Sequence, residues 1–250
     1  MRKRLFNWYW WLERRIHPGL RYSQVHYHDL LDARIPKNCD WLDLGCGHQM
    51  FASWMKKEEH ELAARSRRLV GIDRDLGGLK ENVVIHDAVY GDIGALPFES
   101  GSFDVVTANM VIEHLEDPGT VLGEVRRVLR PGGLFIFHTP NCRSLVMTMA
   151  RMIPQSAKIW LARVLEEREE KDVFPTHYAM NTAGSISEHA RSSGFAVQEI
   201  RSVSTSATTA LITPLCIIEL VYLRMLERPV FAGLRSNLIA TLERAEPADH

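Results

Sequence analysis

Cysteine is scarce in this sequence. Its four cysteines are Cys39, Cys46, Cys142 and Cys216, and no two of them form a Cys-x-x-Cys pair. Wide, irregular spacing argues against a disulfide framework and against a zinc knuckle. Because unpaired cysteines persist in a reducing compartment, we expect a cytoplasmic protein.

A long uninterrupted apolar run is also missing. The longest candidate, Ala210–Leu226, contains Pro214, Glu219 and Arg224, whereas a helix that spans a bilayer needs about 20 apolar residues. The N-terminal stretch MRKRLFNWYWWLERR mixes basic and aromatic residues and lacks the apolar core of a signal peptide. We therefore expect a buried or interfacial helix in the first segment and no secretion signal in the second.

The chain has almost no net charge. Its formal charge is −1 at pH 7, and no broad basic stripe stands out. Nucleic-acid-binding domains usually carry such a stripe, so no nucleic-acid partner is expected.

The middle of the chain alternates short apolar runs with helical patterns, which is typical of βαβ units around a parallel sheet. We predict an α/β fold with a Rossmann-like, seven-stranded, mostly parallel sheet, helices on both faces and helical cap insertions. Helices are expected over 51–66, 118–129 and 182–193. The predicted strands are Asp40–Leu44, Arg68–Asp73, Ala88–Gly91, Phe103–Ala108, Leu134–Thr139, Phe195–Val203 and Ser236–Arg244.

The same pattern predicts a single domain over residues 1–250. Residues 1–36 would form an N-terminal helical cap, 37–141 a cofactor-binding core and 142–180 an insertion. The last core strands would lie within 181–244, interrupted by an apolar segment at 204–235. Such a long connection inside a compact domain is usually functional.

Two clusters of polar residues are given structural interpretations. His26 and His28 alternate in the sequence HYHD, but alternating side chains share a face only on a strand, and the surrounding pattern is helical. We expect no metal site there or elsewhere. The acidic run Glu166–Asp172 is expected to be a solvated helix end.

The stretch WLDLGCGHQM follows the first predicted strand with two glycines, Gly45 and Gly47, but Gln49 and Met50 stand where a dinucleotide fingerprint has its third glycine. A glycine turn at this point lets a ligand approach the backbone at a helix start. The alternative is a tight turn that binds nothing.

Carboxylates follow three successive predicted strands. Asp43 ends the first, Asp73 the second, and Asp92 comes after the third. In open parallel sheets, ligands bind at these carboxyl ends. A carboxylate at Asp43 suits a cationic or amino-bearing ligand, and Asp73 can accept both hydroxyls of a ribose. Helix capping is the alternative for Asp92, as it is for Asp117.

Four motifs in order carry a family resemblance: DLGCG, VGIDRD, GDIGALPFESGSFDVVTANMVIEHLEDP and EVRRVLRPGGLFIFHTPN. Together they resemble the class I S-adenosylmethionine-dependent methyltransferases, and most of all the type 11 branch with the ubiquinone/menaquinone-biosynthesis methyltransferases. The resemblance covers roughly residues 40–141. It implies that S-adenosylmethionine is the cofactor.

The resemblance also implies where the methionine part of this cofactor binds. The loop residues Asp43, Gly45, Cys46 and Gly47 would surround it, and Asn109 would lie nearby. Many members of the family have a small residue or glycine where this chain has Gln49, after His48. These longer side chains would change the contacts at the mouth of the loop.

For the nucleoside part, the resemblance implies four further residues. Asp73 would bind the ribose hydroxyls, and Arg74 would flank the adenine. Asp92 and Ile93 would contact the adenine amino group and the face of its ring.

The catalytic candidates are three histidines, because a hydroxyl acceptor needs a base within hydrogen-bond reach. His114 in VIEHLEDP matches a histidine common in the branch, with a structural role as its alternative. His138 ends a predicted strand, and His177 lies where the 142–180 insertion returns to the core, beside Tyr178.

The acceptor is expected to be a small or lipid-like molecule that is methylated on oxygen or carbon. Aromatic residues next to Arg2, Lys3 and Arg4 suit a membrane interface, and the apolar run 210–226 would add to it. Alternatively, both segments pack together as a cap over the acceptor pocket. The sequence gives no oligomeric state.

Two rival functions stay open. A non-catalytic protein with the methyltransferase fold would explain the lack of an obvious base. An NAD(P)-dependent oxidoreductase is disfavoured by Asp43, by the missing third glycine and by the lack of a Tyr-x-x-x-Lys pair. A nucleic-acid methyltransferase is disfavoured because no DPPY-type or NPPF-type tetrapeptide follows the fourth strand.

Overall fold

The computed structural model describes residues 2–145, 147–148, 175–205 and 213–245. Most of the predicted insertion, including Glu166–Asp172, lies outside the described residues, and so does the start of the 210–226 segment. The chain divides into two compact units. One takes its residues from Met1–His26, Pro140–Pro175 and Ser202–Asn237, the other from Tyr27–Thr139, Thr176–Arg201 and Leu238–His250.

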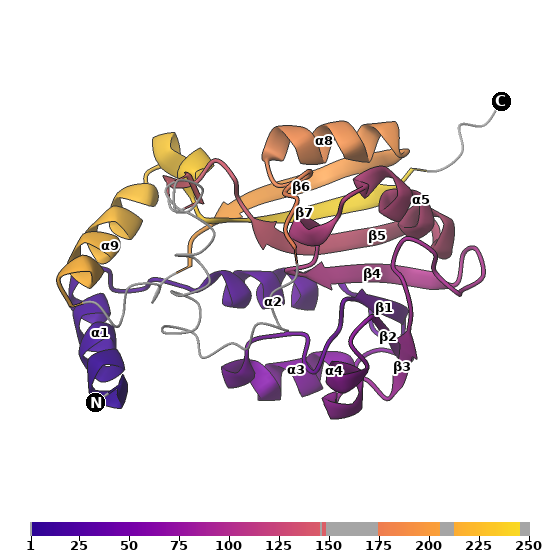
Figure 1. The fold of residues 1–250 in the computed structure, drawn as a ribbon, viewed down its shortest axis with the longest axis horizontal. Helices are drawn as coiled ribbons and strands as arrows, with labels where there is room; N and C mark the ends of the chain where they lie inside the picture. The colour runs from indigo at the N-terminus through magenta and orange to yellow at the C-terminus, as the bar shows by residue number, and fades with distance from the viewer. Residues whose placement is uncertain (1, 146, 149–174, 206–212, 246–250) are drawn as a thin grey trace. The chain divides into compact units, whose positions relative to one another are not determined.

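A seven-stranded sheet of order β3-β2-β1-β4-β5-β7-β6 organises the second unit (Figure 1). Strand β1 pairs in parallel with β2 and β4, β2 with β3, and β4 with β5, while β7 runs against its neighbours (Figure 1). The predicted Rossmann-like α/β fold is confirmed. The strands are β1 (Asp40–Leu44), β2 (Arg68–Asp73), β3 (Asp87–Tyr90), β4 (Phe103–Asn109), β5 (Leu129–Pro140), β6 (Phe195–Val203) and β7 (Asn237–Arg244).

The helices alternate with these strands over most of the chain. The α-helices are α1 (Arg2–Ile16), α2 (Ser23–Arg34), α3 (Lys56–Ala63), α4 (Leu76–Glu81), α5 (Pro118–Val128), α8 (Ala183–Ser192) and α9 (Thr213–Leu226). Short 3-10 turns are η1 (Ser53–Met55), η2 (Ile112–His114) and η4 (Pro229–Leu234). Since His26 and His28 lie within α2, their predicted helical setting is confirmed.

Local sequence explains where α5 and α8 begin. Asp117 caps α5, because its side chain accepts hydrogen bonds from the backbone N–H groups of Gly119 and Thr120 at 3.0 and 3.3 Å. Thr182 and Ser185 form a reciprocal capping box at the start of α8. All five residues of β1 are buried, as expected for a central parallel strand.

Two boundaries differ from the prediction by five residues. We expected a helix from residue 51, but α3 begins at Lys56 after η1. We also took RPGG as a stop between a helix and a strand that begins at Leu134. Strand β5 instead begins at Leu129 and runs through both glycines, with Gly132 at φ +73° and an irregular register against β4 between Phe103 and Val105.

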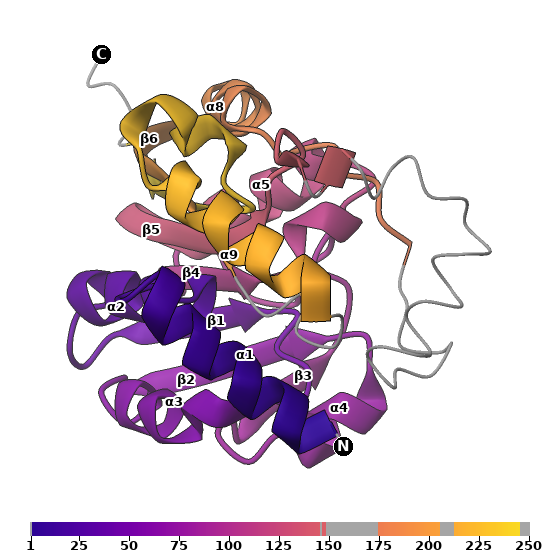
Figure 2. The ribbon, with the colours of Figure 1, turned by 90° about the vertical axis from the view of Figure 1, so that its left-hand side faces the viewer.

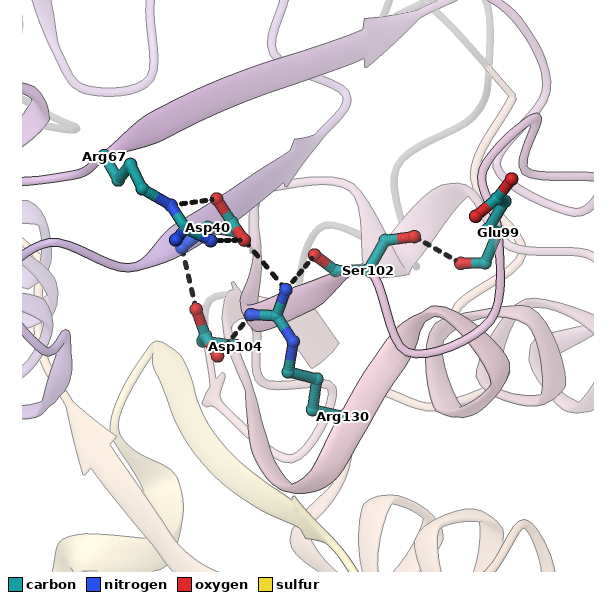
Figure 3. A network of polar contacts seen from close by, with 6 residues as sticks. All are labelled: Asp40, Arg67, Glu99, Ser102, Asp104 and Arg130. Carbon is teal, nitrogen blue, oxygen red and sulfur yellow. Dashed lines mark hydrogen bonds and ion pairs between the residues drawn. The ribbon is translucent and has the colours of Figure 1, made fainter.

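At the amino-terminal edge of the sheet, Asp40 joins a network of ion pairs (Figure 3). Arg67 hydrogen-bonds both oxygens of the Asp40 carboxylate, and Arg130 contacts the same carboxylate at 2.8 Å. Arg130 also pairs with Asp104 at 2.5 Å. These guanidinium groups lower the pKa of Asp40 to about 2, so a buried acid is fully compensated there.

The first unit contains a helical pair. Helices α1 and α9 lie side by side (Figure 2) around Tyr9, Cys216 and Leu220. Arg224 donates a hydrogen bond to the carbonyl oxygen of Ile16 at 2.8 Å, which ties the end of α9 to the end of α1. In the part of the chain that the structure describes, no helix is long and apolar enough to cross a bilayer.

Candidate active site

The glycine loop leaves β1 with two residues in the left-handed region, Gly45 at φ +63° and Gly47 at φ +43°. A Cβ atom on Gly45 would lie 2.5 Å from Val111 Cγ2, so this position admits no side chain. A Cβ atom on Gly47 would meet only the Asp73 carboxylate, at 3.9 Å. The backbone at Gly47 is therefore open to a close approach.

Asp73, at the end of β2, holds this loop. Its Oδ2 accepts a hydrogen bond from the Gly47 N–H at 2.8 Å, and its Oδ1 accepts one from the Asp75 N–H at 2.7 Å. A carboxylate offers about four acceptor positions, so two backbone donors leave capacity for hydroxyl groups. Cys46, between the two glycines, is buried, and burial raises the pKa of its thiol. Its Sγ packs against Gly71, where a Cβ atom would lie only 2.5 Å away.

The far end of the loop is held at Met50 by two side chains. Glu59 on α3 accepts a hydrogen bond from the Met50 N–H at 2.8 Å. Asn109, at the end of β4, donates from its Nδ2 to the Met50 carbonyl at 2.6 Å. Gln49 is thus followed by a buried, fixed residue, and a third glycine is not needed to shape the turn.

The Asn109 contact also orients His138 on β5. Because Asn109 Nδ2 donates to Met50, its Oδ1 is the acceptor for His138 Nδ1, 2.8 Å away. The Tyr27 ring stacks on the imidazole with centroids 5.5 Å apart. Burial lowers the pKa of His138 to about 3. This is a neutral imidazole with its proton on Nδ1, and among the described residues its buried Nε2 has no partner.

Asp43 is the acid with the least compensation at this edge. Its side chain is buried and accepts a hydrogen bond from the Thr107 hydroxyl at 2.5 Å, and Thr107 in turn accepts one from Trp41 Nε1 at 2.7 Å. Burial, followed by the charges of Glu59 and Asp73, raises the pKa of Asp43 to about 7 against the hydrogen bond from Thr107. None of these influences is a cation.

Arg74 and Asp92, expected at the adenine, meet at the ends of β2 and β3. They form an exposed ion pair, and Asp92 also accepts a hydrogen bond from the Gly94 N–H at 2.8 Å. The Gly94 N–H and the Arg74 charge hold the pKa of Asp92 below its usual value. Ile93 is half-buried against the main core.

The other two histidines lie in different surroundings from His138. His177 is exposed, and its backbone N–H donates to the Glu113 carbonyl oxygen at 2.8 Å. His114 is half-buried and ends the η2 turn. Of the three side chains, only that of His138 is closed off from solvent.

Sequence reasoning missed two buried acids, Glu59 and Glu113. Glu113 accepts a hydrogen bond from the Thr139 hydroxyl at 3.0 Å, and Asn181 Nδ2 donates to the same hydroxyl oxygen at 2.6 Å. Burial raises the pKa of both glutamates. A signal existed for Glu59, which shares the inward face of its helix region with Met55 and Leu62 at i, i+4 and i+7 spacing.

No group of three or more metal-binding side chains gathers within residues 2–145, 147–148, 175–205 and 213–245. All four cysteines are buried thiols, and none of them forms a disulfide in the part of the chain that the structure describes. The polar groups described at this edge include carboxylates, backbone N–H groups, an amide, a hydroxyl and an imidazole.

Comparison with known proteins agrees with this geometry. Residues 42–137 match the family model described as a methyltransferase domain. Residues 42–137 are thus similar to a methyltransferase domain, and we call them the methyltransferase domain below. A Mycolicibacterium smegmatis protein described as a probable S-adenosylmethionine-dependent methyltransferase is 34% identical over 137 residues, which cover 50% of this chain and 49% of that one.

Two further matches bear on the methyltransferase domain. The dimethylglycine N-methyltransferase of Parasynechococcus marenigrum is 33% identical over 125 residues, 45% of this chain and 42% of the relative. The chain thus matches less than half the length of either relative. A crystal structure of an S-adenosylmethionine-dependent methyltransferase from Mesorhizobium loti shares the fold, with a TM-score of 0.56 and 18% identity over 86% of this chain and 96% of that chain.

The family's cofactor is S-adenosylmethionine, and the residues of the methyltransferase domain fit it. The cofactor carries a sulfonium and an ammonium cation, a ribose diol and an adenine. Asp43 is a buried carboxyl group, and no cation is among the described groups that shift its pKa. Asp73 keeps free acceptor positions, and the backbone is open at Gly47. The cofactor would supply a cation for the Asp43 carboxylate and hydroxyl donors for the Asp73 carboxylate.

Proposed function

We propose that the protein transfers a methyl group from S-adenosylmethionine to a small-molecule or lipid-like acceptor, on oxygen or carbon, in the cytoplasm. The observation that carries this proposal is Asp43. A buried carboxyl group with a pKa raised to about 7 costs folding free energy. A bound cation would stabilise the ionised form of this carboxyl group and so reduce that cost, and a sulfonium or ammonium group is such a cation.

In this proposal the cofactor supplies an electrophilic methyl group, and the chain binds and orients it. Asp43, Gly45, Cys46, Gly47 and Asn109 form or support the loop around the methionine part. Alignment of this kind supplies much of the rate in a displacement, because the reacting atoms are held in line.

The nucleoside part is assigned to the exposed rim of the same edge. Asp73 would accept hydrogen bonds from the ribose hydroxyls through its free acceptor positions. Arg74, Asp92 and Ile93 would border the adenine, with the Arg74–Asp92 ion pair fixing both side chains beside it. An ion pair this exposed adds little stability, so its use is in positioning.

The three histidines remain candidates for the proton transfer that an oxygen acceptor requires. The unprotonated Nε2 of His138 is in the form that a general base needs, but this atom is buried away from solvent. The contacts support a positioning role for it, through Asn109 to Met50. His177 is exposed and can meet an acceptor directly, and His114 lies between these extremes.

The acceptor class rests on the apolar and aromatic side chains of α1 and α9. Trp10, Trp11, Ile218 and Val221 are large and exposed, which favours a bulky apolar acceptor over a small polar one. The Parasynechococcus relative is named for methylation of an amine. Methylation of a nitrogen atom by this protein would therefore contradict the proposed oxygen or carbon acceptor.

Calorimetry of the purified chain with S-adenosylmethionine, S-adenosylhomocysteine and NAD(P) tests the proposal. We expect binding of the first two and none of the third. Binding of NAD(P) alone would favour an oxidoreductase. No binding of any ligand by the folded chain would favour the non-catalytic alternative.

A further inference from the structure

Helix α9 is apolar on two sides, but only one of them packs against α1. Cys216, Leu220 and Leu223 are buried, the first two in the cluster around Tyr9. On another face, Ile217, Ile218, Val221 and Met225 are between 38% and 63% exposed. An exposed apolar face of this kind, on a helix whose other apolar face is already packed, marks a surface for a further contact.

The exposed side forms a continuous surface rather than scattered contacts. Ile217, Ile218, Val221 and Met225 follow one another at spacings of one, three and four residues, which places them on one helix face. With Tyr222 they line a shallow, open hollow of about 340 Å³. We call these five residues the α9 stripe.

Helix α1, which packs beside α9, adds cations and tryptophans. Arg14 and Arg15 lie in its last turn, and the Arg15 guanidinium lies over the Trp11 ring, 5.1 Å from the centroid. Trp10 and Trp11 are both more than 40% exposed. Glu13 is the one acid in the sequence of α1. Tryptophan and arginine together are typical of helices that lie in the headgroup region of a membrane.

We propose that the α1–α9 pair is a docking surface for an anionic lipid bilayer, with the α9 stripe entering the headgroup boundary and Arg14 and Arg15 of α1 meeting lipid phosphates. Charge decides between this occupant and a second copy of the chain. Two identical surfaces would bring the arginines of α1 toward one another, whereas anionic lipids neutralise them. The 14 residues of α9 extend about 21 Å, shorter than the ~30 Å hydrocarbon layer, so the helix lies along the surface.

Vesicle flotation of the full chain tests the docking surface. We expect binding to phosphatidylcholine vesicles that contain phosphatidylglycerol, weaker binding without the anionic lipid, and release at high salt. Val221→Asp places a charge in the α9 stripe and is expected to weaken binding about tenfold or more. Ile218→Asp, at an equally exposed position, should do the same.

Val83→Asp is the matched control. Val83 lies between α4 and β3 and is 62% exposed, close to the 55% of Val221, so the same substitution there should leave vesicle binding unchanged. Binding of S-adenosylmethionine by each variant reports folding of the methyltransferase domain and is expected to stay as in the native chain.

Three results would overturn the proposal. The native chain could fail to bind anionic vesicles. Val83→Asp could weaken binding as much as Val221→Asp does. Sedimentation could show a dimer that Val221→Asp dissociates, with no vesicle binding, which would make a second copy the occupant. Because flotation does not depend on activity, each of these results leaves the proposed methyl transfer untouched.

Discussion

Asp40 begins strand β1 and Asp43 lies near its end, and the two buried carboxyl groups have opposite surroundings. Two guanidinium groups meet Asp40 at the amino-terminal edge and lower its pKa to about 2. At the carboxyl-terminal edge, Asp43 has the Thr107 hydroxyl and two neighbouring acids, and its pKa rises to about 7. One strand thus carries a compensated charge that stabilises the fold and an uncompensated one.

The difference separates structural from functional acids. Burying a charge costs free energy unless a partner compensates it. Asp40 has its partners within the chain, so its interactions are complete without a ligand. Asp43 has no positive group among those that shift its pKa, so the proposed function assigns it a cationic ligand as its partner. Shifted pKa values of this kind cluster at functional sites.

The largest effect is expected at Asp73, which belongs to the carboxyl-terminal edge. Asp73→Ala removes the proposed acceptor for the ribose hydroxyls, and it also removes the hydrogen bond from the Gly47 N–H. We expect the affinity for S-adenosylmethionine to fall ten- to hundredfold, the ~1.5–3 kcal/mol of a lost charged hydrogen bond. Calorimetry measures it, and an unchanged affinity would remove Asp73 from the site.

Asp43→Asn is next. It removes the charge and keeps the shape, so the affinity for S-adenosylmethionine should fall about thirtyfold, or about 2 kcal/mol. In the ligand-free chain, the same variant should be at least as stable as the native protein at neutral pH, because a charge that is costly to bury has gone. Thermal melts check this second part. A large loss of stability would mean that Asp43 is structural, like Asp40.

Asp40→Asn should give the reverse pattern. The pKa of Asp40 is depressed in the folded state, so its ionised form contributes stability above its unfolded pKa. We expect the free energy of unfolding to fall by about 2 kcal/mol at neutral pH, while the affinity for S-adenosylmethionine stays within about twofold. Urea unfolding and calorimetry measure the pair of values. A thirtyfold loss of affinity in Asp40→Asn would erase the distinction between the two edges.

The pH dependence of stability follows with the same sign. The Asp40 contribution should be present above pH 4 and disappear as the pH falls toward 2, where its folded-state pKa lies. In Asp40→Asn, the free energy of unfolding should therefore fall less between pH 4 and pH 2 than it does in the native chain. A native and a variant profile that differ by a constant amount from pH 2 to pH 6 would contradict it.

The fold was largely predictable from the sequence, because buried parallel strands carry the plain signal of β-branched and apolar runs. Strands β1, β2 and β6 begin and end where their patterns predict. The start of β5 was not predictable, because Pro131 and Gly132 usually interrupt a strand. Here Gly132 takes a positive φ within it.

The site was predictable only in part. The glycines and the acids at the strand ends have sequence signatures, since each follows an apolar run. Glu113 does not, and Glu59 has only its helical spacing with Met55 and Leu62 as a signal, because a glutamate within a helical pattern is usually solvated. The hydrogen-bond donor to Glu113 is Thr139, 26 residues away in the chain, and the donor to Glu59 is the backbone of Met50 in the preceding loop.

The most direct test of the contrast between Asp40 and Asp43 is the affinity for S-adenosylmethionine as a function of pH. Measurements between pH 5.5 and 7.5 stay below the ~8 at which an α-amino group loses its proton. Since Asp43 must ionise to meet the cation and its pKa is about 7, we expect affinity to rise about tenfold across this range. The rise should be absent in Asp43→Asn and kept in Asp40→Asn. A pH-independent affinity in the native chain, or an unchanged rise in Asp43→Asn, would contradict the role of Asp43 as the cofactor's counter-ion.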